Sequence, residues 1–155
     1  MFAKNLTIIV KEQQWVSQHV LSRRLYGTHD ETQRRRIRRL MNERIRPTLD
    51  VVIMYARALD VHASDLAFKE LHKGFNAFVE VEDRFAANLA LYEKDYSTFQ
   101  MAIMLYPNKR VIDKNDERKL RRLVQGVTKP RLDDIVNLAN GLGVHPGVLC
   151  FGVCP

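Results

Sequence analysis

The chain carries the stretch RRLMNERIRPTLDVVIMYARALDVHASDLAF at residues 38–68 and a second version of it, RRLVQGVTKPRLDDIVNLANGLGVHPGVLCF, at residues 121–151. The two align without a gap at a constant offset of 83, and 12 of the 31 positions are identical, whereas background residue frequencies would give about two. We therefore expect the 155 residues to form two copies of one small unit, over residues 1–74 and 75–155.

Each copy contains a proline followed by an apolar stripe. A proline suits a loop that leads into a helix, and apolar residues at three- and four-residue steps predict an amphipathic helix. The helix is expected to end at Asp60 in the first copy and at Gly143 in the second. His62 and His145 then precede a short final helix, where a polar side chain can cap exposed amides. The predicted stripes are Leu49, Val52, Ile53, Ala56 and Leu59, and Leu132, Ile135, Val136, Ala139 and Leu142.

Upstream of each proline lies a basic helix, DETQRRRIRRLMNE at 30–43 and NDERKLRRLVQG at 115–126. Spacing places the apolar residues inward and the cations outward. The first of these helices could start at Asp30, at Thr32 or with a Thr28–Glu31 capping box, and these alternatives stay open. In the second helix we expect Asp116 to be the cap. The residues expected inward are Ile37, Leu40, Met41, Leu120, Leu123 and Val124.

A further short helix precedes each basic one. Residues 17–27 are anchored by Val20, Leu21 and Leu25, and residues 97–107 by Met101, Ile103 and Leu105. Two short helices joined by a turn, the second of them basic, form a helix-turn-helix. A helix over 77–95, capped by Asn76, is expected to open the second unit.

The string PTLDVVIMYARALDVHASDLAF resembles the downstream half of the lambda-repressor/Cro-type (XRE-like) helix-turn-helix domain, and PRLDDIVNLANGLGVHPGVLCF is similar. The resemblance implies an all-α fold of two lambda-repressor-like five-helix units in tandem. It also implies DNA binding as a dimer, with bases read from the start of the third helix of each unit.

By position, the resemblance assigns base reading in the first copy to Gln33, Arg34, Arg35 and Arg38, with Arg39 beside them, and phosphate contacts to Asn42 and Arg44. The matching positions in the second copy are Asp116, Glu117, Arg118 and Arg121, with Lys119 and Arg122 on the same basic face. Glu117 at such a place indicates either that this copy has lost DNA binding or that it reads a cytosine amino group.

The charge of the chain favours a polyanionic partner. With 25 Lys/Arg and 18 Asp/Glu the net charge is +7, and the pI is near 9.6. Residues 1–76 hold 14 basic and 8 acidic side chains, a net of +6, whereas residues 77–155 hold 11 and 10, a net of +1. The first copy is therefore the stronger candidate for contact with double-stranded DNA.

No pattern in the sequence indicates an enzyme, because it has no phosphate loop, nucleophile elbow or metalloprotease motif. Cys150 and Cys154, with His145 nearby, could hold a metal. Zinc sites usually have four ligands and closer cysteine pairs, and Cys150 aligns with Ala67, an ordinary packing position. We therefore expect buried thiols, no metal and no cofactor.

The chain has no apolar run that approaches the roughly 20 residues of a membrane span. The apolar stretch near its N-terminus is too short to be the core of a signal peptide. These features lead us to expect a cytoplasmic, nucleoid-associated protein without membrane contact. The sequence thus predicts a homodimeric regulator, most often a repressor, that binds a specific DNA operator. The alternative is a protein–protein interaction module, antitoxin-like or regulator-binding, in which one or both units have lost DNA binding. In a blend of the two, the first copy binds DNA and the second dimerises.

Overall fold

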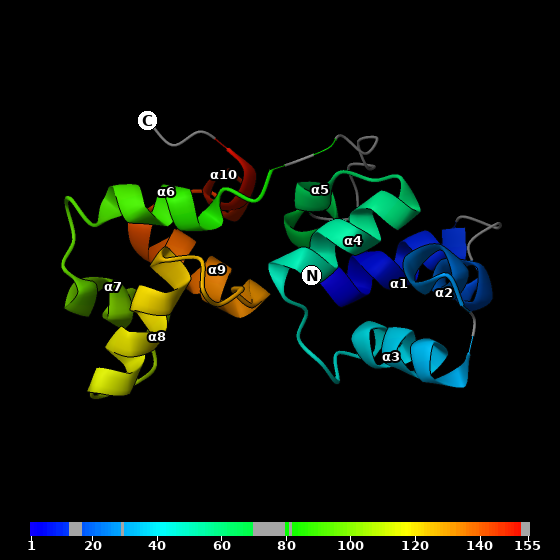
Figure 1. The fold of residues 1–155 in the computed structure, drawn as a ribbon, viewed down its shortest axis with the longest axis horizontal. Helices are drawn as coiled ribbons and strands as arrows, with labels where there is room; N and C mark the ends of the chain where they lie inside the picture. Colours follow the sequence, from blue (N-terminus) through cyan, green and yellow to red (C-terminus); the bar gives the residue numbers. More distant parts are fainter. Residues whose placement is uncertain (13–16, 29, 70–79, 81, 153–155) are drawn as a thin grey trace. The chain divides into compact units, whose positions relative to one another are not determined.

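The computed structural model describes residues 1–12, 17–28, 30–69, 80 and 82–152, and within these residues it contains ten helices and no strand (Figure 1). The prediction of an all-α protein is confirmed. The chain divides into two compact units, Met1–Val81 and Glu82–Pro155. The boundary expected between residues 74 and 75 lies outside the described residues.

Within the described residues, each unit contains five helices in the same order. The first unit has α1 (Phe2–Glu12), α2 (Gln18–Tyr26), α3 (Glu31–Met41), α4 (Leu49–Leu59) and α5 (Ala63–Phe68). The second unit has α6 (Phe85–Tyr92), α7 (Thr98–Leu105), α8 (Lys114–Val124), α9 (Leu132–Leu142) and α10 (Pro146–Phe151). The last three helices of the two units begin and end at positions that differ by the same 83 residues as the sequence repeat.

The core of the first unit is centred on α4, whose predicted stripe is buried at Leu49, Val52, Ala56 and Leu59. Helix α1, whose bounds were not predicted, packs on α3 and α5. It buries Phe2, Leu6 and Ile9, and the Phe2 ring lies edge-on to the buried Tyr55 at 5.9 Å. Helix α1, with its 11 residues, is therefore part of the core of the first unit.

The second unit repeats this core with one departure from the prediction. Met101 and Leu105 of α7 are buried, whereas Ile103, predicted as an anchor, is 46% exposed. Met101, Ala102 and Leu105 already occupy the inward face of this eight-residue helix. Since successive residues turn by about 100°, Ile103 falls on the opposite side, and the expectation that it anchors α7 is wrong.

A buried asparagine joins the first and last helices of each unit. In the first unit Asn5 Nδ2 donates to the carbonyl oxygens of Asp65, Leu66 and Lys69 at 3.0–3.1 Å. In the second unit Asn88 donates to the carbonyls that lie 83 residues further on, those of Val148, Leu149 and Gly152, at 2.9–3.4 Å. These carbonyls lie at the end of a helix, where backbone acceptors run short of intrahelical donors, although those of Asp65 and Val148 also accept the N–H groups of Lys69 and Gly152. The signal was in the sequence, where FAKNL at 2–6 and FAANL at 85–89 share the same offset.

Most predicted helix ends are confirmed. Ser17 and Ser97 cap α2 and α7, and the imidazoles of His62 and His145 accept backbone N–H groups at the start of α5 and α10. Of the alternatives for α3, Asp30 is the cap, and its Oδ1 accepts the Gln33 N–H at 2.9 Å.

Helix α6 begins later than predicted. Residues 82–84 are not helical, because the Arg84 N–H donates to the Cys150 carbonyl at 2.9 Å and Asp83 accepts the Phe85 N–H at 3.1 Å. The expected helix over 77–95 is therefore wrong at residues 82–84, and its expected cap, Asn76, lies outside the described residues.

Replacing Asn88 by alanine should destabilise the second unit by about 2–3 kcal/mol, because buried carbonyls at the end of α10 lose their donor. Asn5→Ala should do the same in the first unit. Asn88→Asp should cost more than Asn88→Ala, since it places a carboxylate against three carbonyl oxygens. Denaturant unfolding measures these differences, and an Asn88→Ala variant as stable as the parent would contradict the assigned role.

Gly141 allows α7 to approach α9, because a Cβ at this position would lie 2.5 Å from Cγ and 2.6 Å from Cβ of Met104. Gly141→Ala should therefore destabilise the protein, since an overpacking cost of about 1–3 kcal/mol exceeds a gain in helix propensity of roughly 1 kcal/mol. In a Met104→Gly background the same substitution should become stabilising, because both obstructing atoms, Cγ and Cβ, are gone. Thermal or denaturant unfolding of the four variants would reveal this change of sign. A destabilisation that is equal in both backgrounds would refute the packing argument.

Candidate nucleic-acid interface

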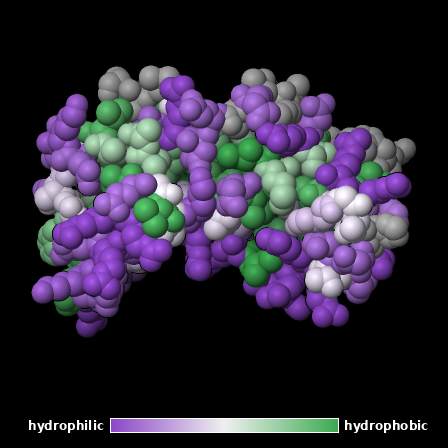
Figure 2. All heavy atoms as spheres, viewed as in Figure 1, coloured by the Kyte–Doolittle hydropathy of each residue, from purple (hydrophilic) through white to green (hydrophobic). Residues whose placement is uncertain are grey.

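Helix α3 presents a cationic face because its apolar face is buried. Ile37 and Leu40 are 0% and 2% exposed, and the helix packs on α1 and α2. Arg35, Arg38 and Arg39 are exposed on the remaining surface. Figure 2 shows hydrophilic side chains, in purple, over the region where Figure 1 places α3. The buried pair thus fixes the direction in which the arginines point.

Glu31 binds two of the predicted base-reading arginines. Its carboxylate lies 3.0 Å from Arg34 Nη2 and also accepts a hydrogen bond from Arg38 Nη2. The side chains of Arg34 and Arg38 remain 42% and 49% exposed, and Arg34 Nε is buried without a hydrogen-bond partner among the described residues. Exposed ion pairs contribute at most about 1 kcal/mol. A phosphate or base acceptor can therefore displace Glu31 at small cost.

The other candidates of the first unit lie at both ends of α3. Gln33 is half-buried in the first turn. Asn42 and Arg44 are exposed just beyond the last turn, where the backbone of Glu43 turns with φ 56°. Eleven helical residues separate the two ends by roughly 16 Å. Gln33 is thus at one end of the helix, whereas Arg38, also predicted to read bases, lies in the last turn close to Asn42 and Arg44.

A tyrosine–cation contact recurs in both units and was not predicted. The Arg36 guanidinium lies 5.8 Å from the centre of the Tyr26 ring, and Lys119 Nζ lies 5.2 Å from that of Tyr106. The two cations are 83 residues apart. The Tyr26 hydroxyl lies 3.4 Å from the hydroxyl of the buried Tyr55. Burial raises the pKa of Tyr55. The Arg36 side chain therefore lies against Tyr26, the last residue of α2, although Arg36 belongs to the basic run of the sequence.

In the second unit α8 buries Leu120 and Leu123 and exposes Arg118, Arg121 and Arg122. Lys119 departs from the prediction that it projects outward. Its Nζ lies 2.7 Å from Asp134 Oδ1 in α9, and the side chain is 35% exposed. An acidic partner on a neighbouring helix and the Tyr106 ring together turn Lys119 towards α7 and α9.

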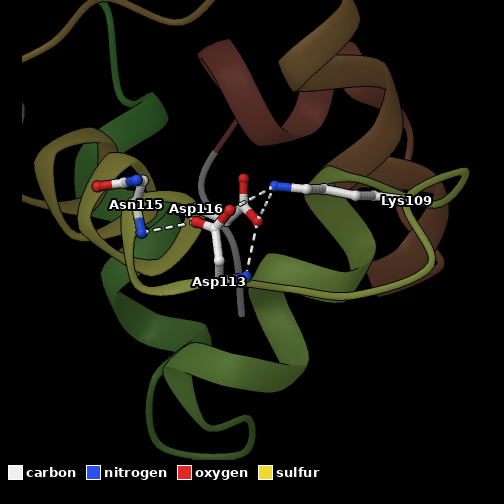
Figure 3. Close-up of polar contacts among 4 residues, drawn as sticks. All are labelled: Lys109, Asp113, Asn115 and Asp116. Atoms are coloured by element: carbon white, nitrogen blue, oxygen red, sulfur yellow. Dashed lines mark hydrogen bonds and ion pairs between the residues drawn. The ribbon is translucent and has the colours of Figure 1, made fainter.

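The start of α8 is held by Lys109, Asp113, Asn115 and Asp116 (Figure 3). Asp113, and not Asp116 as predicted, caps the helix, and it accepts the N–H groups of Asn115 and Asp116 at 2.8 and 3.1 Å. Asp116 is only 6% exposed, because its carboxylate accepts the Asp113 N–H and binds Lys109. The position that resemblance assigned to base reading is therefore buried.

The Lys109–aspartate cluster also shifts the pKa values of its members. Hydrogen bonds from Lys109 and then from the backbone lower the pKa of Asp113 below 3.8, and hydrogen bonds to Asp116 and Asp113 raise the pKa of Lys109 above 10.5. The negative charges of Asp113 and Asp116 are thus compensated in part by Lys109, which lies in the preceding loop. Glu117, next in the chain, is half-buried and lies 3.5 Å from Arg121 Nη2.

Comparisons with protein-family models, with characterised proteins and with solved structures give no match for this chain. Among the described residues, no group of three or more His, Cys, Asp or Glu side chains could hold a metal ion. In the same part of the chain, no helix combines the length and the apolar character needed to cross a bilayer. Cys150 is buried, as predicted, and burial raises the pKa of its thiol.

Asp113→Ala should destabilise the second unit at neutral pH, and the difference from the parent should shrink in acid. A carboxyl group whose folded-state pKa is lowered stabilises the fold above its ordinary pKa of 3.8, and this contribution is lost as the pH falls through the lowered value. Urea unfolding of the parent and the variant at several acidic and neutral pH values measures the difference. Asp95→Ala, at an exposed position outside the cluster, is the control. A difference that does not change with pH would contradict this account.

Proposed function

We propose that the chain is a sequence-specific DNA-binding regulator that reads the major groove of a duplex with α3. The observation that carries the proposal is the pairing of exposed arginines on this helix with an apolar face buried in its own unit. A helix of this kind fits the width of the major groove. The resemblance to lambda-repressor/Cro-type domains and the excess of cations in residues 1–76 support the same proposal.

In the proposed complex, guanidinium groups on the exposed face of α3 bind base edges. The fork of Arg35 or Arg38 can bond the O6 and N7 atoms of a guanine, and Arg38 and Arg34 exchange the Glu31 carboxylate for an acceptor on DNA. Asn42 and Arg44, at the C-terminal end of the helix, bind phosphates and fix its position along the groove.

The two units contribute unequally in this proposal. In α8 the base-reading position of Asp116 is buried and Lys119 is held by Asp134, so that Arg118, Arg121 and Arg122 are the cations left for phosphate contacts. One strong reading helix in each chain favours a homodimer on a two-fold symmetric operator, with half-sites set by the distance between the two α3 helices. Occupancy of such an operator represses the adjacent promoter, in the manner of bacterial, phage or mobile-element regulators.

A second candidate function is that of a protein–protein interaction module. Exposed apolar residues of the second unit favour it, above all Val127, which is 64% exposed and aligns with Arg44 of the first unit. In this alternative the chain binds another protein, and its cations only keep the surface solvated.

A salt titration of binding separates the two candidates. Affinity for a random duplex and for a duplex enriched by selection should both fall as the salt concentration rises, with a log–log slope of roughly one for each phosphate contacted. The enriched duplex should stay the tighter ligand throughout. A slope near zero, or equal affinity for the two duplexes, would support the interaction module and refute the DNA-reading role.

Substitution of the α3 arginines tests which helix reads the bases. Arg35→Ala and Arg38→Ala should each reduce discrimination between selected and random duplexes by about 1–3 kcal/mol. Arg38→Lys keeps the charge but lacks the planar fork, so it should lose discrimination while the salt slope stays unchanged. Arg57→Ala, which removes an exposed arginine of α4, is the matched control and should preserve selectivity. Full selectivity in both alanine variants would show that α3 is not the reading helix.

A further inference from the structure

Glu31 is the one acidic residue of α3 (ETQRRRIRRLM), and it lies among the arginines of that helix. Its side chain is 53% exposed, and its carboxylate binds Arg34 through Oε2 at 3.0 Å and Arg38 through Oε1. These arginines follow Glu31 by three and seven residues, which is about one and two turns of the helix. Glu31 does not cap the helix, because Asp30 accepts the Gln33 N–H. The carboxylate is therefore held beside the groups that the proposed function assigns to base edges.

The second unit has a different arrangement near the start of its basic helix. Asp116 of α8 is 6% exposed, and its carboxylate accepts the Asp113 N–H and binds Lys109. These partners come from the backbone and the loop of the same unit. The position that aligns with Glu31 is Lys114. An exposed carboxylate between basic side chains of the reading helix is thus a property of the first unit and not a requirement of the shared fold.

Contact with DNA would change the surroundings of the Glu31 carboxylate. In the proposed complex Arg34 and Arg38 exchange this carboxylate for acceptors on DNA. A carboxylate can accept about four hydrogen bonds, and a charged acceptor that is enclosed without donors is strongly unfavourable. Once its two cations have turned to the DNA, Glu31 faces a polyanion. It therefore needs a hydrogen-bond donor on a base edge.

The major groove offers few donors of this kind. Guanine presents the acceptors O6 and N7, and thymine presents the acceptor O4 and a methyl group. Adenine has an amino group, but its N7 acceptor lies beside it and repels a carboxylate. Cytosine presents its N4 amino group without a neighbouring acceptor, and this group is the usual partner of glutamate and aspartate. The chemistry of the groove therefore selects cytosine.

We propose that Glu31 reads a cytosine amino group and is a specificity-determining residue of α3. This role rests on the proposed function, because it requires α3 to lie in the groove. Exposed ion pairs are weak, so Arg34 and Arg38 hold the carboxylate on the exposed face without trapping it. A duplex that lacks the cytosine leaves the carboxylate without a donor or keeps the arginines from their bases, and both outcomes lower the affinity. Glu31 thus acts mainly against wrong sequences.

The test is selection from random duplexes with the wild type and with Glu31→Gln, followed by binding measurements on single-pair variants of the enriched duplex. The wild type should enrich a C·G pair in each half-site that Glu31→Gln no longer enriches. Guanine positions that depend on Arg35 and Arg38 should be enriched by both proteins. Replacing this C·G pair by T·A should weaken binding of the wild type by about tenfold, whereas binding of Glu31→Gln should hardly change.

Glu43→Gln is the matched control, because it removes the same charge from an exposed position just beyond the end of α3. It should enrich the wild-type motif, and circular dichroism verifies that both variants remain folded. An unchanged motif with Glu31→Gln would overturn the inference. A loss of preference at every position would also overturn it, since Glu31 would then only orient the arginines. Both results leave the proposed function standing, whereas a wild type that enriches no motif refutes the two together.

Discussion

The burial of Ile37 and Leu40 beneath α3 is the constraint on which the proposed function depends. Both side chains are almost fully enclosed in their unit, and burial of side chains of this size stabilises a fold by about 1.5–3 kcal/mol each. A helix held in this way cannot rotate without exposing them. The arginines on its other faces are therefore fixed in direction by the core, and a ligand needs only to displace the weak pairs with Glu31. The same arrangement recurs in α8 with Leu120 and Leu123.

The two units share a frame and differ in their surfaces. The frame includes the buried asparagine between the first and last helices, the histidine caps of α5 and α10, and the cation over a tyrosine ring. These interactions lie within each unit and stabilise it whatever the unit binds. Outside these shared interactions, the second unit has the buried Asp116 where the first has the half-buried Gln33, and the exposed Val127 where the first has the exposed Arg44. Such a pattern is typical of two copies that have taken different roles.

Much of the fold could be predicted from the sequence because the repeat is gapless over α3, α4, α5 and their counterparts. The boundaries of α8 could not, since DKND at 113–116 offers several capping residues. In the structure Asp113 accepts the N–H groups of Asn115 and Asp116, whereas the Asp116 carboxylate accepts the Asp113 N–H. Helix α7 has apolar residues on several faces, so its periodicity did not distinguish the inward Met101 from the outward Ile103. The inward turn of Lys119 depends on Asp134, which lies on another helix. For Asn5 and Asn88 the signal existed, in the repeated FAKNL and FAANL, but lay outside the aligned segment.

The most direct test of the central claim is selection from a library of random duplexes with the wild-type chain, followed by footprinting of the enriched DNA. If α3 reads the groove, a motif that contains guanines should be enriched as a palindrome, with one half-site for each chain and protection over both half-sites. Recovery of unrelated sequences with no protected region would contradict the claim that the arginine face of α3 reads DNA.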